Sequence, residues 1–199
     1  MLFNPLAFLI HPIKQWKRVG DAPADAFDLA AVYPMVCAIV PAAAWYYGAT
    51  QVGWALGGGD IAKLTEASAF RICIAFYLAM VCSILAIGYS IFWMSKTYGA
   101  ETSFTKGIAI SGFTATPLFI AGLLGLHPLL WLDLVLGTLA SSWAVFLLFI
   151  GVPIVMRIPK EQGFLYSSAI LSVCLVWMIV ILVSTVILWD VGFMPVFTD

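Results

Sequence analysis

Charged residues are scarce in this 199-residue chain: they make up 10% of it, against roughly 25% in an ordinary soluble domain. The nine Lys and Arg residues form no basic patch, so nothing indicates nucleic-acid binding. His11 and His127 are far apart, and the four cysteines lack ligand spacing, so we expect no metal site and no cofactor. No nucleophile-and-base pair or HExxH string is present, which makes an intramembrane enzyme the least favoured class.

Long apolar stretches fill most of the chain instead, with 63% hydrophobic residues and a mean hydropathy of +1.06. Lipid offers backbone groups no hydrogen-bond partner, and runs without period-2 alternation exclude a barrel, so these stretches predict helices. Each is about long enough to cross a ~30 Å hydrocarbon core. The alternative for the first stretch, a cleaved signal peptide, conflicts with its start near Leu29. We predict an all-α polytopic membrane protein, a five-helix bundle with spans at about 29–47, 70–94, 108–124, 129–150 and 165–189.

The basic residues are distributed unevenly between the two sides of this bundle, and short loops rich in Lys and Arg stay in the cytoplasm. Only Lys63 and Arg71 fall on one side. The other seven share the opposite side: Lys14, Lys17, Arg18, Lys96, Lys106, Arg157 and Lys160. The asymmetry predicts a cytoplasmic N-terminus and an external C-terminus.

Residues 1–20 precede the first span and have a pattern of their own, distinct from the membrane domain of residues 21–199. Apolar residues recur at helical spacing up to Trp16, and Lys17 and Arg18 follow directly. This predicts a cytoplasmic amphipathic helix in the membrane interface, with Trp16, Lys17 and Arg18 as its anchor. The His11-Pro12 pair predicts a break or kink in it. The segment is either a lipid- or partner-binding arm or a simple anchor.

One acidic and one basic residue fall at similar depth near the external ends of two spans. Asp133 lies about one turn inside the fourth span, and Arg71 lies at the end of the second. Ionisable groups at membrane depth are costly and mark function by default. We predict either a structural charge pair or a site for a lipid headgroup or ion.

Hydroxyls and prolines, in place of charges, occupy the predicted centre of the membrane. The hydroxyls and the carbonyls freed by proline either line a polar cavity or bond to neighbouring helices. Gly107, Ser111 and Ala115 form a small-residue face that predicts close contact with another helix. The candidate cavity residues are Ser83, Ser111, Thr114, Thr116, Pro117, Ser141 and Ser142.

Four short strings together resemble the Yip membrane-protein family, in particular its bacterial YohC-like inner-membrane branch. They are residues 11–16 (HPIKQW), 50–54 (TQVGW), 112–118 (GFTATPL) and 160–164 (KEQGF). The most specific is the Gly-aromatic-x-x-x-Pro core from Gly112 to Pro117, where Phe113 replaces the more usual Tyr. The resemblance implies five spans and a cytoplasmic N-terminus. Eukaryotic members associate with Rab-type GTPases, a partner that we do not expect for a bacterial chain.

Three function classes follow from these observations. The favoured one is a non-enzymatic membrane protein that binds, organises or moves lipid, with membrane lipids as its partners. A small-solute or ion transporter or channel is the first alternative, although the chain lacks a carboxylate near the midplane. The second is an accessory subunit that associates with other membrane proteins or with itself.

Overall fold

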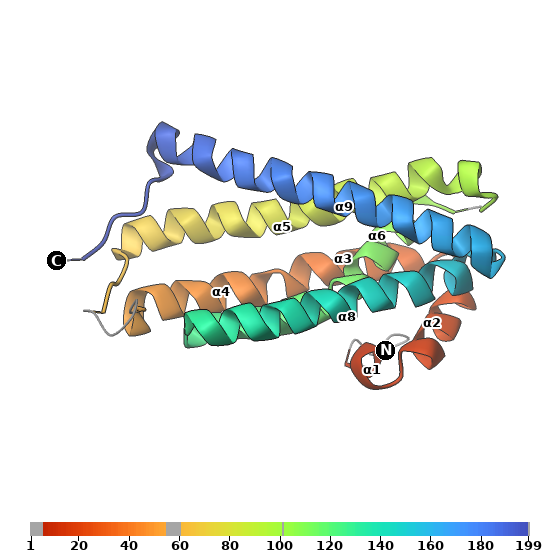
Figure 1. The fold of residues 1–199 in the computed structure, drawn as a ribbon, viewed down its shortest axis with the longest axis horizontal. Helices are drawn as coiled ribbons and strands as arrows, with labels where there is room; N and C mark the ends of the chain where they lie inside the picture. Colours follow the sequence, from red (N-terminus) through yellow and green to blue (C-terminus); the bar gives the residue numbers. More distant parts are fainter. Residues whose placement is uncertain (1–5, 55–60, 101, 199) are drawn as a thin grey trace.

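The structure is a computed structural model that describes residues 6–54, 61–100 and 102–198. These residues form a bundle of long helices, with the short helices α1 and α2 packed beside one half of it and the segment after α9 at the other end (Figure 1). The elements in chain order are α1 (Ala7–Ile10), α2 (Pro12–Gly20), α3 (Ala26–Cys37), α4 (Ile39–Tyr47), η1 (Gly48–Val52), α5 (Glu66–Met94), η2 (Ser95–Tyr98), α6 (Phe104–Thr114), α7 (Thr116–Ala121), η3 (Gly122–Leu126), α8 (Leu130–Met156), α9 (Lys160–Leu188) and η4 (Trp189–Phe193).

Four continuous helical segments are long and apolar enough to cross a membrane: Ala26–Val52, Glu66–Tyr98, Leu130–Met156 and Lys160–Phe193. A fifth forms when the pair Phe104–Thr114 and Thr116–Leu126, bent by 45°, is counted as one span. The bend precedes Pro117, which has no N–H to donate and is favoured in the first turn of α7. The prediction of an all-α polytopic membrane protein is confirmed.

The first span packs along the bent third span through three close contacts spaced seven residues apart. Pro34, Pro41 and Gly48 share one face, because seven residues make about two helical turns. A Cβ added to Gly112 would lie 2.6 Å from Cγ of Pro34. Similarly, a Cβ on Gly122 would collide with Pro41, and one on Gly48 with the carbonyl oxygen of Gly125. Only glycine on one side of each contact permits this approach.

Helix α6 lies at the centre of the bundle, between α3, α5 and α8. All of its residues from Gly107 to Phe113 are buried. The sequence predicted close contact for one face of small residues, whereas the structure buries the whole circumference of this part of α6. Gly107 packs against the backbone of Gly88 on α5, as expected for a close helix contact. Ile110, which lies about 100° around α6 from Ser111, has no exposed surface either.

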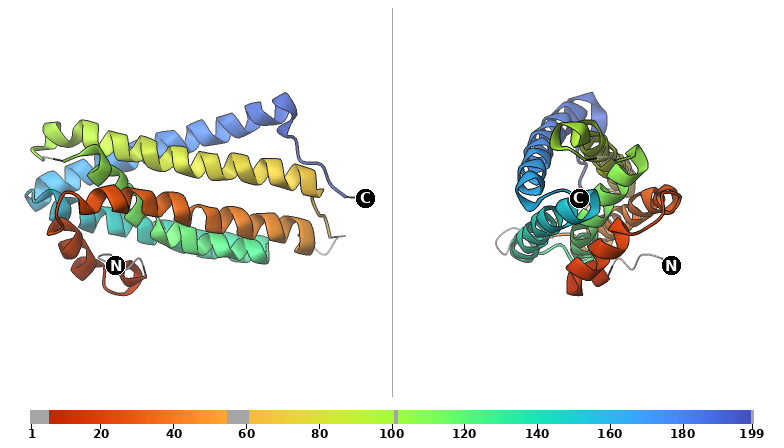
Figure 2. Two further views of the ribbon diagram at one scale, coloured as in Figure 1. Left: turned by 180° about the vertical axis from the view of Figure 1, so that it is seen from behind. Right: turned by 90° about the vertical axis from the view of Figure 1, so that its right-hand side faces the viewer.

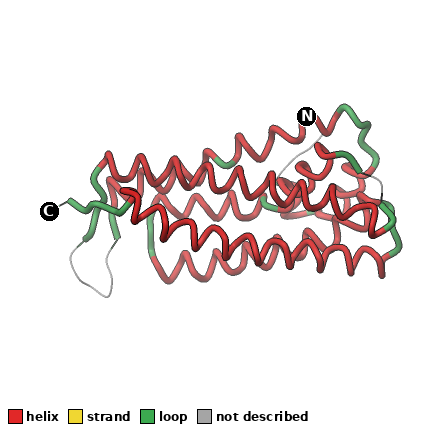
Figure 3. The backbone as a smooth tube through the Cα atoms, turned by 90° about the horizontal axis from the view of Figure 1, so that it is seen from above, coloured by secondary structure: helices red, strands yellow, loops and turns green. Residues whose placement is uncertain are grey.

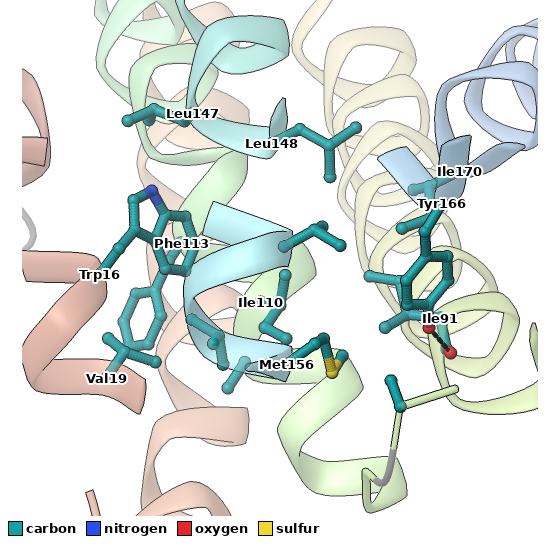
Figure 4. Packing of buried hydrophobic residues seen from close by; sticks show 14 of the residues in the cluster. Trp16, Val19, Ile91, Ile110, Phe113, Leu147, Leu148, Met156, Tyr166 and Ile170 are labelled. Atoms are coloured by element: carbon teal, nitrogen blue, oxygen red, sulfur yellow. Dashed lines mark hydrogen bonds between the residues drawn. The ribbon is translucent and has the colours of Figure 1, made fainter. Parts of the chain in front are cut away.

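The main hydrophobic core occupies the end of the bundle next to the N-terminal helices (Figure 4). Trp16 and Phe113 meet there, and the phenol of Tyr166 on α9 donates a hydrogen bond to the carbonyl oxygen of Ile91 on α5. Farther along the bundle, α9 stays at the periphery with few contacts (Figure 2). We call the end of the bundle that contains this core the core end, and the opposite end the open end.

At the open end, the chain returns across the bundle after η4 (Figure 3). Residues 194–198, the C-terminal strap, run antiparallel to residues 63–65. The backbone amides of Thr65 and Thr198 donate hydrogen bonds to the carbonyl oxygens of Val196 and Lys63, respectively. The amide of Val196 donates to the hydroxyl of Ser68. Trp54 forms a second antiparallel bridge with Ala62. The strap that follows α9 is therefore hydrogen-bonded to the segment that precedes α5.

Candidate functional site

The two ionisable residues predicted as a charge pair are not paired in the structure. Arg71 donates from Nε to the carbonyl of Ala67 and from Nη1 to the carbonyl of Gly192, at 3.3 and 3.2 Å. Asp133 Oδ1 is buried without a hydrogen-bond partner. In the described part of the chain the one ion pair joins Arg157 to Asp21, at the core end. The charge-pair hypothesis was wrong, because similar depth does not place two residues on facing sides of their helices.

The hydroxyls predicted to line one polar cavity are dispersed over the bundle. Ser141 and Ser142 are exposed on α8 and donate to carbonyls of their own helix, at 2.8 and 2.9 Å. Ser83 accepts a hydrogen bond from the Trp177 indole at 2.7 Å and ties α5 to α9. The prediction of a shared polar cavity was therefore wrong for these three residues.

The remaining members of that set lie at the bend of the third span. Thr116 hydrogen bonds to the Tyr33 hydroxyl at 3.0 Å, while Thr114 Oγ1 is buried without a partner. Ser111 is buried in α6 and Pro117 in α7. The alternative that hydroxyls bond to neighbouring helices thus describes Ser83 and Thr116.

The N-terminal segment is broken at His11 as predicted, into α1 and α2; its first five residues lie outside the described part. Trp16 has no exposed surface, and its indole covers Gly151 of α8. A Cβ on Gly151 would lie 2.5 Å from Cε2 of that ring. Trp16 therefore anchors the segment to the protein rather than to lipid, while Lys17 and Arg18 are exposed.

The open end contains a feature that sequence reasoning missed: an almost wholly apolar cavity of about 510 Å³ between the first, second and last spans. Phe76, Trp189 and Phe197 line it while remaining 39%, 46% and 51% exposed, so the cavity is partly open. Its lining comprises Trp45 and Ala49; Trp54 and Leu64; Ala69, Ile72, Cys73, Ala75, Phe76 and Ala79; Ile181, Ser184, Thr185 and Leu188; and Trp189, Phe193, Pro195 and Phe197.

Small side chains on α5 and the divergence of α9 create this space. Ala69, Ala75 and Ala79 project little from one face of α5. The two hydroxyls on the α9 wall, Ser184 and Thr185, donate to carbonyls of α9 at 2.7 and 2.9 Å. Their protons are thus directed into the helix backbone, and the cavity remains apolar.

The outer boundary of the cavity is aromatic and formed partly by the C-terminal strap. Trp54 packs edge-on against Phe197 of the strap, with ring centroids 6.2 Å apart. Trp45 and Trp189 line the same cavity from α4 and η4. Tryptophans concentrate at the boundary between hydrocarbon and headgroups, so this aromatic boundary has the composition typical of a membrane interface.

No group of three or more His, Cys, Asp and Glu suited to hold a metal ion occurs within residues 6–54, 61–100 and 102–198. The spans and the cavity define the molecule as a polytopic α-helical membrane protein with an apolar recess at one end. A family model described as Yip1 domain matches residues 6–181, and the chain belongs to this family. The resemblance inferred from the four short strings is confirmed.

The relatives agree with this assignment. The chain is 36% identical over 165 residues to the inner membrane protein YohC of Escherichia coli strain K12, covering 83% of this chain and 81% of that protein. The protein of the same name from Escherichia coli O6:H1 strain CFT073 matches equally. No solved structure gives a significant match.

Proposed function

We propose that this chain is a non-enzymatic inner-membrane protein that binds the hydrocarbon tail of a membrane lipid in the cavity between α5 and α9. The observation that carries the proposal is a partly open, apolar cavity built into membrane-spanning helices. Its volume falls within the roughly 300–1,000 Å³ range of small-molecule sites. The name of the Escherichia coli relatives supports the location in the inner membrane.

The chemistry of the lining favours a lipid tail over a polar solute. A polar solute entering the cavity would lose its hydration without gaining partners, at a cost of a few kcal/mol per unpaired group. A hydrocarbon chain incurs no such cost, and it enters from the surrounding lipid without crossing water. Transport of an ion or small polar solute through this cavity is therefore disfavoured.

Two native cysteines on α5 permit a direct test. Cys73 lines the cavity, whereas Cys82 is exposed on the same helix and does not line it. We would prepare two variants, each with Cys73 or Cys82 as its single cysteine. In micelles at constant detergent concentration, we would measure the rate at which an uncharged maleimide alkylates that cysteine. Added long-chain lipid should slow alkylation of Cys73 and leave Cys82 unchanged. Equal rates at Cys73 with and without lipid would refute the proposal.

The proposed orientation places the core end in the cytoplasm. The helix bounds put Lys14, Arg157 and five further basic residues at the core end, and Lys63 and Arg71 at the open end. The cavity then lies in the outer leaflet. Reporters fused after Arg18 and near Pro159 should report a cytoplasmic location, and reporters near His127 and at the C-terminus an external one. A cytoplasmic C-terminus would contradict this orientation.

A further inference from the structure

Arg71 lies at the edge of the cavity, in the sequence directly before two residues that line it. Ile72 and Cys73 face the cavity, and the Arg71 side chain reaches across to η4. Its acceptor there, Gly192, precedes the cavity residue Phe193. The guanidinium thus connects the two helical elements that form opposite sides of the opening.

Within residues 6–54, 61–100 and 102–198, no carboxylate balances the charge of this guanidinium. Arg71 is exposed, and its two hydrogen bonds are both to backbone carbonyls, those of Ala67 and Gly192. No described acidic side chain forms an ion pair with it. Because a guanidinium carries about five N–H donors, roughly three remain for another partner.

We infer that Arg71 binds the phosphate of the lipid whose tail occupies the cavity, so that the ligand is a glycerophospholipid; this inference rests on the proposed function. An apolar recess bordered by a guanidinium that no described carboxylate pairs with matches a molecule with a hydrocarbon tail and an adjacent phosphate. Arginine is suited to phosphate because its planar fork donates two parallel hydrogen bonds. Trp189, a lining residue that is 46% exposed, lies on the η4 side of the same opening.

The test compares two lipids with identical acyl chains, phosphatidylglycerol and diacylglycerol, in the assay of Cys73 alkylation. Phosphatidylglycerol should protect Cys73 at a lower concentration than diacylglycerol. Arg71→Gln should raise the half-protecting concentration of phosphatidylglycerol about tenfold, equivalent to about 1.4 kcal/mol. The same change should leave protection by diacylglycerol unaltered, which also shows that the variant is folded.

Matched controls separate the phosphate contact from general effects of charge. Lys63 is a second cation at the open end, and its ammonium donates to the carbonyl of Gln51. Lys63→Gln should therefore leave the phosphatidylglycerol response unchanged, and Arg71→Lys should retain part of it. Inorganic phosphate alone should not protect Cys73, because it has no tail to fill the cavity.

The possible failures are distinguishable. If neither lipid protects Cys73, the proposed function fails and the phosphate inference fails with it. If both lipids protect equally and Arg71→Gln has no effect, the tail site stands and the phosphate contact is refuted. Protection by inorganic phosphate would overturn the assignment of the ligand as a lipid. An equal loss in Lys63→Gln would show a non-specific effect of charge and would also overturn the inference.

Discussion

The contact between Trp16 and Gly151 provides the most direct test of how the N-terminal segment is held. Gly151→Ala would place a methyl group 2.5–2.8 Å from three atoms of the fully buried Trp16 indole. The ring cannot yield easily, because it also packs edge-on against Phe8, with centroids 4.8 Å apart. We therefore expect the substitution to displace α2 from α8 and destabilise the fold.

The magnitude follows from comparison with a second glycine on the same helix. A Cβ on Gly137 would meet no atom within 4 Å. Gly137→Ala should therefore show only the gain of a helical Gly→Ala change, about 0.5–1 kcal/mol. Gly151→Ala receives the same gain but also incurs an overpacking cost of about 1–3 kcal/mol. The difference in unfolding free energy between the two variants should thus be about 1–3 kcal/mol, with Gly151→Ala the less stable.

The assay is unfolding in detergent micelles titrated with a denaturing detergent, followed by circular dichroism. A third variant, Trp16→Ala, provides the internal control. In that background the indole is absent, and Gly151→Ala should become neutral or stabilising, because substitutions in contact are not additive. If Gly151→Ala unfolds together with Gly137→Ala, or if Trp16→Ala does not relieve it, the docking of α2 through this contact is refuted.

Three further outcomes are expected. Ser111→Leu, in the buried central helix, should lower the unfolding free energy by about 1–3 kcal/mol, whereas Ser142→Leu on the exposed side of α8 should change it little. Equal unfolding free energies of the two variants would show that Ser111 is not in a tightly packed position. Arg71→Gln and Asp133→Asn should be additive within about 0.5 kcal/mol, since the structure does not pair them, and a larger coupling in the double-mutant cycle would argue for a contact. Removing the C-terminal strap should accelerate alkylation of Cys73, because the strap bounds its cavity, and an unchanged rate would show that the strap does not limit access.

The positions of the spans were predictable because their physical cause is local. A continuous apolar run must become a helix in lipid. Proline disfavours an uninterrupted helix, and helix breaks precede both Pro12 and Pro117. The structure shows both interruptions. The close contact of Gly107 with α5 was also predictable, because helices approach closely where small side chains recur at helical spacing.

The functional features depended on rotation of the helices about their axes, which the sequence did not determine. Ser141 is the residue type expected in a polar cavity, but the rotation of α8 places it on an exposed face, where its hydroxyl donates to the carbonyl of Gly137 on its own helix. The apolar cavity could not be predicted either, because its lining has the same composition as a lipid-facing surface. The available signal was the set of small residues Ala69, Cys73, Ala75 and Ala79 on one face of α5.

The central position of α6 has a consequence for biosynthesis. Its neighbours α3 and α5 precede it in the chain, so both are available to pack against it before α8 is synthesised. The third span carries the polar residues and the bend that would be unfavourable in direct contact with lipid. Its stable insertion during translation therefore depends on the first two spans being already present in the membrane to receive it. The order of the helices along the chain is thus also a workable order of assembly.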